Sequence, residues 1–176
     1  HSSFSSNPNW TTDWSTLVPA PASLANANFQ TAVNLWFTDE ANATRTYGHI
    51  KDWNVTGVTR MYQAFNNRTT FDENISAWDV SNVTSMGGMF QGATTFNQPI
   101  GDWNTSAVTN MGHMFRRTTS FNHDIGDWNT SAVTNMNKMF KEASTFDHDI
   151  SDWNVSAATN MTEMFKSTNA LSNSYK

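Results

Sequence analysis

The chain has 176 residues, enough for one domain with a sizeable core. Only 14% of its residues are charged, and the formal net charge is −5, a balance that argues against nucleic acid as a partner. No apolar run is long enough to span a bilayer. The absence of cysteine excludes disulfides and thiolate metal sites.

The first 21 residues form an arm rich in Ser, Thr and Pro. So polar a segment buries too little apolar surface to fold alone. Its large apolar residues predict that it docks in an extended form, anchored by Phe4, Trp10, Trp14 and Leu17.

Residues 22–52 are predicted to form a helical N-terminal cap. Four large apolar residues share one face at helical spacing, namely Phe29, Val33, Trp36 and Phe37. The segment Thr38-Asp39-Glu40-Ala41 is typical of a helix start, and Gly48 of a helix end. We therefore expect a second short helix before the rest of the chain begins.

From residue 53 to residue 176 a 25-residue unit recurs five times. Tryptophan marks each unit, at Trp53, Trp78, Trp103, Trp128 and Trp153, and Met, Phe and Ile recur at the same interval. A fixed period of this length indicates a repeat architecture in which each unit buries its apolar face against its neighbours.

Each unit contains two apolar patterns. Val108, Met111, Met114 and Phe115 have the spacing of one helical face, whereas Phe121, Ile125 and Trp128 have the spacing and composition of a short strand. The predicted fold is therefore α/β, a leucine-rich-repeat-like solenoid of five strand-plus-helix turns with a helical N-terminal cap. We expect each turn to bury one Trp, two Met, two Phe and one Ile.

Two units carry a resemblance most clearly: WDVSNVTSMGGMFQGATTFNQPIG and WNTSAVTNMNKMFKEASTFDHDIS. They resemble the BspA-type surface-protein repeat, and the match covers about residues 29–170. The resemblance implies a leucine-rich-repeat-like solenoid displayed outside the cell, with adhesion or interaction roles and no enzymatic activity. The arm lies outside the match.

Sequons for N-glycosylation are the strongest surface signal. Four follow the core Trp directly, where strand alternation would point them outward. We expect Asn104 and Asn129 to be the main sugar carriers. The full set is Asn9, Asn42, Asn54, Asn67, Asn74, Asn82, Asn104, Asn129, Asn154 and Asn160.

Two other columns of polar residues have alternative interpretations. Stacked acidic residues such as Asp124 and Asp149 could bind calcium for glycan recognition, although Asp is also an ordinary turn residue. A column of Thr84, Thr109 and Thr134 could serve ice binding. No catalytic set can be assembled from the sequence, so we predict a protein that is not an enzyme and needs no cofactor or metal.

The sequence predicts a secreted or cell-surface glycoprotein, a non-enzymatic adhesion, interaction or structural module with protein or glycan partners. The alternative is a filament subunit that assembles head to tail. In that case the arm of one copy contacts the last turn of the next, where no polar cap covers Met161, Met164, Phe165 and Leu171.

Overall fold

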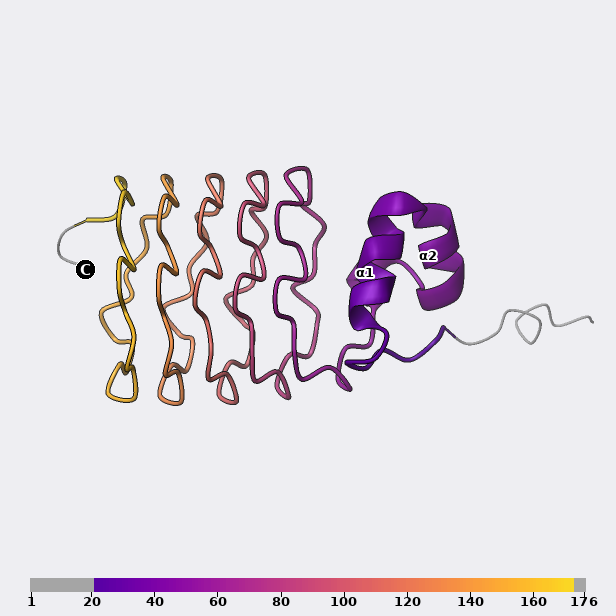
Figure 1. The fold of residues 1–176 in the computed structure, drawn as a ribbon, viewed down its shortest axis with the longest axis horizontal. Coiled ribbons are helices and arrows are strands. Elements are labelled where there is room, and N and C mark those ends of the chain that lie inside the picture. The colour runs from indigo at the N-terminus through magenta and orange to yellow at the C-terminus, as the bar shows by residue number, and fades with distance from the viewer. Residues whose placement is uncertain (1–20, 173–176) are drawn as a thin grey trace, which may run out of the picture.

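The computed structural model describes residues 21–172, and the arm residues Phe4, Trp10, Trp14 and Leu17 lie outside this range. Two helices stand at one end of a row of coils that stack side by side (Figure 1). The coils follow the 25-residue units, so that the first begins at Trp53 and the last at Trp153.

The two helices cover the N-terminal end of the row. Helix α1 spans Phe29–Thr38, α2 spans Glu40–Tyr47, and a short 3-10 helix, η2, follows at Ile50–Asp52. The predicted second helix is confirmed: the Asp39 side chain accepts a hydrogen bond from the backbone N–H of Asn42 at 3.0 Å, and Gly48 ends the helix with a φ of 81°.

Aromatic contacts join α1 to the first two units. The ring of Phe29 lies 6.0 Å from that of Trp78, and the ring of Phe37 lies 6.4 Å from that of Phe65, both edge to face. No helix in the described part of the chain is long and apolar enough to cross a membrane.

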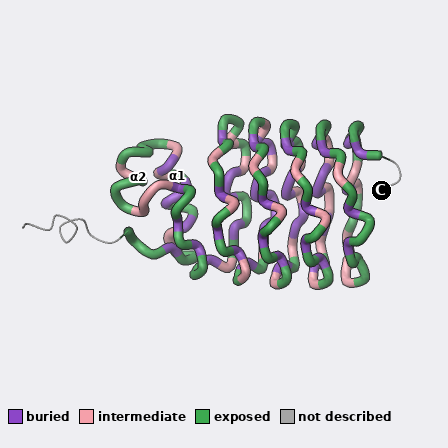
Figure 2. The backbone as a smooth tube through the Cα atoms, turned by 180° about the vertical axis from the view of Figure 1, so that it is seen from behind, coloured by how far each residue is buried: buried purple, intermediate pink, exposed green. Residues whose placement is uncertain are grey.

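The core runs through the stacked units as continuous columns of identical side chains. Phe90, Phe115 and Phe140 stack with centroids 5.6–5.7 Å apart, and all three are fully buried. Buried residues accordingly recur along every coil in Figure 2. The prediction that two Met, two Phe, one Trp and one Ile of each unit are buried is confirmed for the three middle units.

The tryptophans form one of these columns. Trp78, Trp103, Trp128 and Trp153 are 3–7% exposed, and Trp128 and Trp153 lie parallel with ring centroids 6.4 Å apart. The indole N–H of Trp128 donates to the carbonyl of Ile100, 28 residues earlier in the chain, at 3.1 Å. Because Ile100 ends the second unit and Trp128 begins the fourth, this bond ties together coils on either side of the third.

The predicted α/β fold is wrong. Within residues 53–172 the units contain neither a helix nor a strand, and the only β-pairing between successive coils consists of isolated parallel bridges such as Ser85 with Asn110 and Asn110 with Asn135. Each turn is built from β-turns and irregular segments, not from a strand followed by a helix as in leucine-rich repeats.

The expected helix is a pair of consecutive β-turns. In the third unit, the N–H of Met114 donates to the carbonyl of Met111, and that of Thr118 to the carbonyl of Phe115. The third residues of these turns, His113 and Arg117, have φ values of 61° and 62°, as type II turns require. Turns closed between residues i and i+3 return apolar side chains to the core with the same spacing as a helix, so the periodicity could not separate them.

The expected strand is replaced by a ladder of side chains bonded to backbone. The N–H of Asn122 donates to Oδ1 of Asn97 in the preceding unit at 3.0 Å, and the N–H of Asp147 donates to Oδ1 of Asn122 at 2.9 Å. Asn and Asp oxygens thus accept the bonds that neighbouring strands would otherwise exchange.

Candidate ligand-binding site

The paired turns of the five units lie side by side and form one surface, which we call the turn ladder. In the third unit, alternate N–H groups of this segment donate to the fourth unit: those of Met111, His113, Phe115 and Arg117 bond to its carbonyls at 2.7–2.9 Å. The N–H groups of Met114, Arg116 and Thr118 close turns within the unit, and that of Gly112 donates to Oδ1 of Asn110. The ladder comprises residues 61–68, 86–93, 111–118, 136–143 and 161–168.

Every unit places two residues of the turn ladder in the left-handed conformation. Only the second unit uses glycine for both, at Gly88 and Gly92, and the other four units use larger residues. The second unit also has Gly87 where the first has Tyr62. The glycines therefore remove from this unit the side chains that its neighbours carry.

The missing side chains leave a hollow of about 270 Å³. It is lined by glycines of the second and third units and by larger side chains of the first three units. The lining residues are Tyr62, Gln63, Gly88, Gln91, Gly112, His113 and Arg116. Tyr62 is 57% exposed, the largest exposure of a large hydrophobic side chain among the described residues.

A second hollow of about 340 Å³ lies beside the first, between α1 and the first unit. Both hollows are lined by Tyr62 and Gln63, so together they form one groove along the turn ladder, which we call the polar groove. The second hollow is lined mostly by amide side chains, including those of Gln30, Asn34 and Asn66. None of the lining residues of either hollow is acidic.

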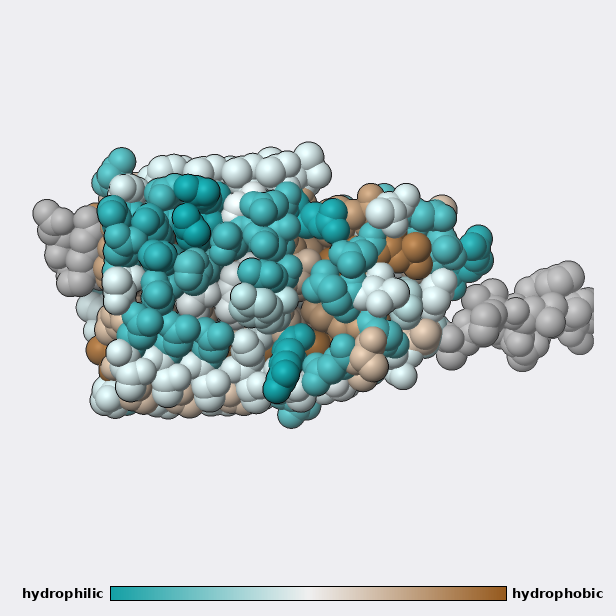
Figure 3. Space-filling model, viewed as in Figure 1, coloured by the Kyte–Doolittle hydropathy of each residue, from teal (hydrophilic) through white to brown (hydrophobic). Residues whose placement is uncertain are grey.

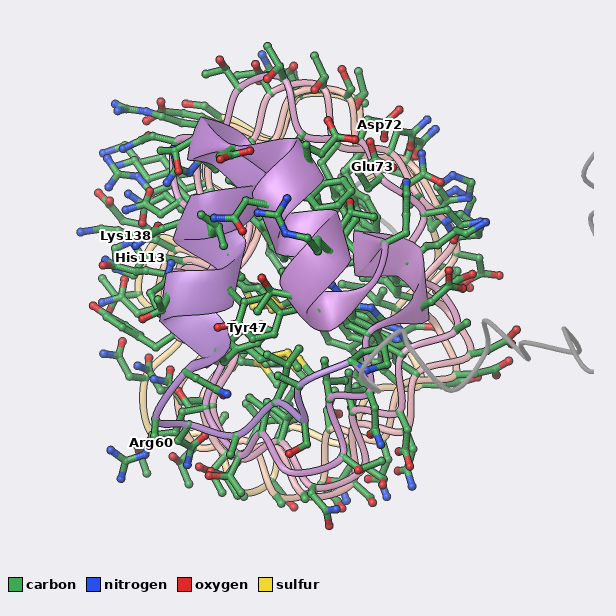
Figure 4. All side chains as sticks on the ribbon, turned by 90° about the vertical axis from the view of Figure 1, so that its right-hand side faces the viewer. Tyr47, Arg60, Asp72, Glu73, His113 and Lys138 are labelled. Carbon is green, nitrogen blue, oxygen red and sulfur yellow. The ribbon has the colours of Figure 1, made fainter. Side chains whose placement is uncertain are left out.

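Positive charges gather at the end of the polar groove. We call Arg116, Arg117, Lys138, Lys141 and Lys166 the basic patch; they occupy three columns of the turn ladder in the last three units. Hydrophilic residues cover this part of the molecule in Figure 3, and His113 and Lys138 project from the same side in Figure 4.

Two carboxylates neutralise part of the basic patch. Arg117 Nε lies 2.7 Å from the Glu142 carboxylate, and Lys141 Nζ lies 2.6 Å from that of Glu163. Hydrogen bonds from Lys141 and Lys166 hold the pKa of the Glu163 carboxyl at about 2. In the described part of the chain, Arg116 makes no ion pair, and its buried Nε has no hydrogen-bond acceptor.

His113 forms the wall of the hollow next to Arg116. Burial lowers the pKa of His113 below its ordinary value, and the positive charges of Arg116, Lys138 and Lys141 lower it further. Its buried Nδ1 has no hydrogen-bond partner among the described residues. The site thus places a guanidinium without an ion-pair partner beside an imidazole whose pKa is lowered by burial first and by neighbouring positive charges second.

The predicted sugar carriers occupy several different environments. Asn54, Asn104, Asn129 and Asn154 are exposed, and each Oδ1 accepts a hydrogen bond from the backbone two residues further on. Asn74 is exposed in the same kind of turn, and Asn67 is exposed in a left-handed conformation.

The remaining sequons are less accessible, have a hydrogen-bonded side-chain amide or lie outside the described residues. Asn82 is exposed, but its Nδ2 donates to the carbonyl of Thr56. Asn42 and Asn160 are half-buried, and Asn9 lies outside the described residues.

The predicted assembly residues at the C-terminal end are only partly accessible. Met161 is 39% exposed and Phe165 is half-buried, whereas Met164 and Leu171 are 4% and 2% exposed.

Among the described residues, the acidic column considered for calcium binding and the Thr column considered for ice binding both lack the free groups that these roles need. No group of three acidic, His or Cys residues that could hold a metal occurs among the described residues. The hydroxyls of Thr84, Thr109 and Thr134 each donate to the carbonyl of the preceding unit, so they are tied to the backbone.

The sequence prediction missed the polar groove. Its signal is present as a break in the repeat: Tyr62 stands where the other units have small residues or Asn, and Gly87 and Gly88 are adjacent. The separate clustering of Arg116, Lys138 and Lys141 also becomes visible once the units are aligned at a 25-residue interval.

Two overlapping stretches of the chain, residues 31–128 and 100–176, match the family described as Mycoplasma protein of unknown function, DUF285. The chain therefore belongs to that family. No curated protein and no solved structure matches the chain.

Proposed function

We propose that this protein is an extracellular, non-enzymatic recognition module of the BspA-like surface-repeat type, and that it binds its ligand in the polar groove. The observation that carries this proposal is the hollow beside Tyr62, where glycines replace the side chains of neighbouring units. Ligand sites are concave and combine an apolar surface with a few convergent polar groups. Tyr62, Gln63 and Gln91 supply this combination.

Glycine in the second unit is not required by the backbone alone. Gln63, His113 and Lys138 adopt the same left-handed conformation at the position that Gly88 occupies. A glycine in that conformation avoids strain of about 1–2 kcal/mol, but four units fold without it. Its effect specific to the second unit is the open space above it.

A glycan array tests the proposed surface. We expect the wild-type protein to bind at least one class of glycan, and Tyr62→Ala to lose that binding because the exposed ring is removed. Gly88→Gln places in the second unit the residue that the first carries there, and should also lose binding by filling the hollow. Ser120→Gln, which adds the same side chain at an exposed position elsewhere, is the matched control and should bind normally. A bound glycan that is insensitive to both groove variants would refute the proposal.

Assembly through the outer face of the last described unit is a second candidate. Val155 and Met161 are 42% and 39% exposed on this unit. The N–H groups of Met161, Glu163, Phe165 and Ser167 have no acceptor among the described residues, whereas the equivalent groups of the fourth unit bond to the fifth. Unpaired backbone of this kind can pair with another chain.

Sedimentation of the purified protein over a range of concentrations tests this candidate. We expect self-association that Met161→Glu weakens, because a charge on the contact face must be desolvated. Thr162→Glu is a neighbouring control at an exposed position. A monomer at every concentration, or equal effects of the two variants, would exclude assembly through this face.

A further inference from the structure

We propose that the ligand of the polar groove is an acidic polysaccharide whose carboxylate or sulfate groups bind at Arg116 and His113 and continue over the lysines of the basic patch. This inference rests on the proposed recognition function and names its ligand class. It follows from three features of the turn ladder: charge, unpaired polar atoms and spacing.

The charge of the basic patch opposes that of the molecule. The chain carries a net charge of −5 and has ten Lys and Arg residues in all. Five of the ten form the basic patch, and only Glu142 and Glu163 lie among them. This leaves an excess of positive charge on one face of an acidic protein, which attracts a polyanion to that face.

Unpaired polar atoms point to an anionic group beside Arg116. Buried polar atoms are usually hydrogen-bonded, yet Arg116 Nε and His113 Nδ1 both lack a partner among the described residues. Both residues line the same hollow. A guanidinium binds the oxygens of a carboxylate or sulfate through two donors at once. His113 Nδ1 accepts from a ligand hydroxyl while the ring is neutral and donates to the anionic oxygens once the ring is protonated.

The spacing of the units suits a polymer with repeated charges. Ring centroids of Phe115, Phe140 and Phe165 repeat at 5.6–5.9 Å, so the basic residues of successive units recur at about that interval. A chain that carries one charge on each of several sugars can therefore meet Arg116, Lys141 and Lys166, which occupy one column of the turn ladder.

The other end of the polar groove suits sugar rings. The amides of Gln63 and Gln91 can donate to and accept from hydroxyl groups, and the exposed face of Tyr62 can pack on the apolar face of a ring. Only one exposed aromatic ring is present in the groove, whereas single-stranded nucleic acids are bound by rows of stacking rings. The groove therefore favours a polysaccharide over an oligonucleotide.

The test measures binding to four immobilised probes at about 0.15 M salt, where long-range attraction is screened. The probes are a polyuronate, a sulfated dextran, neutral dextran and a single-stranded oligodeoxynucleotide. We expect binding to the polyuronate or the sulfated dextran and none to neutral dextran. The two acidic probes identify whether carboxylate or sulfate is the preferred group. Equal or tighter binding of the oligonucleotide would overturn the inference.

Two variants and one control locate the binding site. Arg116→Gln should weaken binding about tenfold or more, because a charge-assisted hydrogen bond is lost; its side chain makes no ion pair, so the fold should be unaffected. Glu163→Gln should strengthen binding because it releases Lys141 and Lys166.

Arg60→Gln is the control: it removes one charge at a position away from His113 and Lys138 in Figure 4 and should change little. Equal losses for Arg116→Gln and Arg60→Gln would overturn the inference.

The outcome also separates this inference from the proposed function. If neither acidic probe binds but a neutral glycan binds in a manner that depends on Tyr62, the ligand class is wrong and the recognition function stands. If no glycan of any kind binds, both fail.

Discussion

At the scale of single residues, the turn ladder depends on left-handed residues that are mostly not glycine. Eight non-glycine residues of the turn ladder have φ values between 54° and 63°. Each such residue is less favourable than glycine by about 1–2 kcal/mol. Six of them contribute side chains that form ion pairs, such as that of Arg117 with Glu142, or that line the polar groove.

His113 is a residue at which this strain can be measured. We expect His113→Gly to stabilise the protein by about 0.5–1 kcal/mol, because glycine accepts the φ of 61° without strain, partly offset by its greater freedom in the unfolded chain. The substitution also removes the unpaired Nδ1. Urea unfolding measures the change. Ser120→Gly, at an exposed position without positive φ, should instead destabilise; stabilisation by both variants would show that strain at residue 113 is not the cause.

The lowered pKa of His113 predicts how binding depends on pH. Burial and the charges of Arg116, Lys138 and Lys141 keep His113 neutral at pH 7; no other charged group lines its hollow. A bound anion favours the protonated form, so binding takes up a proton and affinity should rise as the pH falls below the ordinary value of 6.5.

A sulfated probe makes this measurement clean, since its own charge does not change in that range. Isothermal titration between pH 5 and pH 8, the interval in which histidine titrates, should show the rise for the wild type. The rise should be absent for His113→Gln, and an equal rise in both would assign it to another group.

At the scale of the elements, the sequence predicted the repeat, its core residues and the second helix of the cap, but not the local conformation of the units. The 25-residue interval alone places Trp128 above Trp103 and Met136 above Met111, because neighbouring units must bury the same faces.

The backbone conformation between these residues is set by hydrogen bonds that the hydrophobic pattern does not reveal. Asn97 and Asn122 bond to backbone across units, and His113 and Arg117 turn the chain with positive φ.

The polar groove was unpredictable for a related reason. It is an absence of side chains at Gly87 and Gly88 between units that carry Tyr62 and His113. These residues come together only if the turns lie side by side, and a helix in each unit would have placed them differently. The sequence pattern that identifies a repeat averages over its units, and the groove is a deviation from that average.

The stacked columns make the cost of core substitutions depend on the place of a unit in the row. Phe115 is fully buried and packs between Phe90 and Phe140, with ring centroids 5.7 and 5.6 Å away, so Phe115→Ala should destabilise by about 3–5 kcal/mol. Phe165 is half-buried and stacks on Phe140 alone among the described rings. Phe165→Ala should therefore cost less, roughly 1–2 kcal/mol.

Urea unfolding of the two variants measures this difference. Equal losses at the two positions would mean that the stack behaves as one indivisible core, in which burial at the last unit is as complete as in the middle.

At the scale of the whole molecule, charge is separated across the width of the stack. His113 and Lys138 project on one side in Figure 4, and Asp72 and Glu73 on the other. The column that begins with Asp72 continues through Asn97, Asn122 and Asp147. One molecule therefore presents a basic face to an anionic ligand and an acidic side that repels it, which orients the ligand on the turn ladder.

Glycosylation is the modification expected of such a molecule if it is secreted, and the structure differentiates the sequons. In Asn104 and Asn129, Oδ1 accepts the N–H of Ser106 and Ser131 at 3.1 Å, and the exposed Nδ2 has no partner among the described residues. A sugar on this nitrogen disturbs no hydrogen bond of the fold. In Asn82, by contrast, Nδ2 donates to the carbonyl of Thr56 at 3.0 Å.

We therefore expect Asn104 and Asn129 to carry glycans, and Asn82 to carry one less often, when the protein passes through a eukaryotic secretory pathway. Intact mass before and after enzymatic deglycosylation measures the total, and Asn104→Gln and Asn129→Gln should each remove the mass of one glycan. Asn82→Gln is the matched control and should change the glycan mass little. A protein from its native source whose mass is unchanged by deglycosylation would contradict the prediction and leave these residues as an unmodified column of turns.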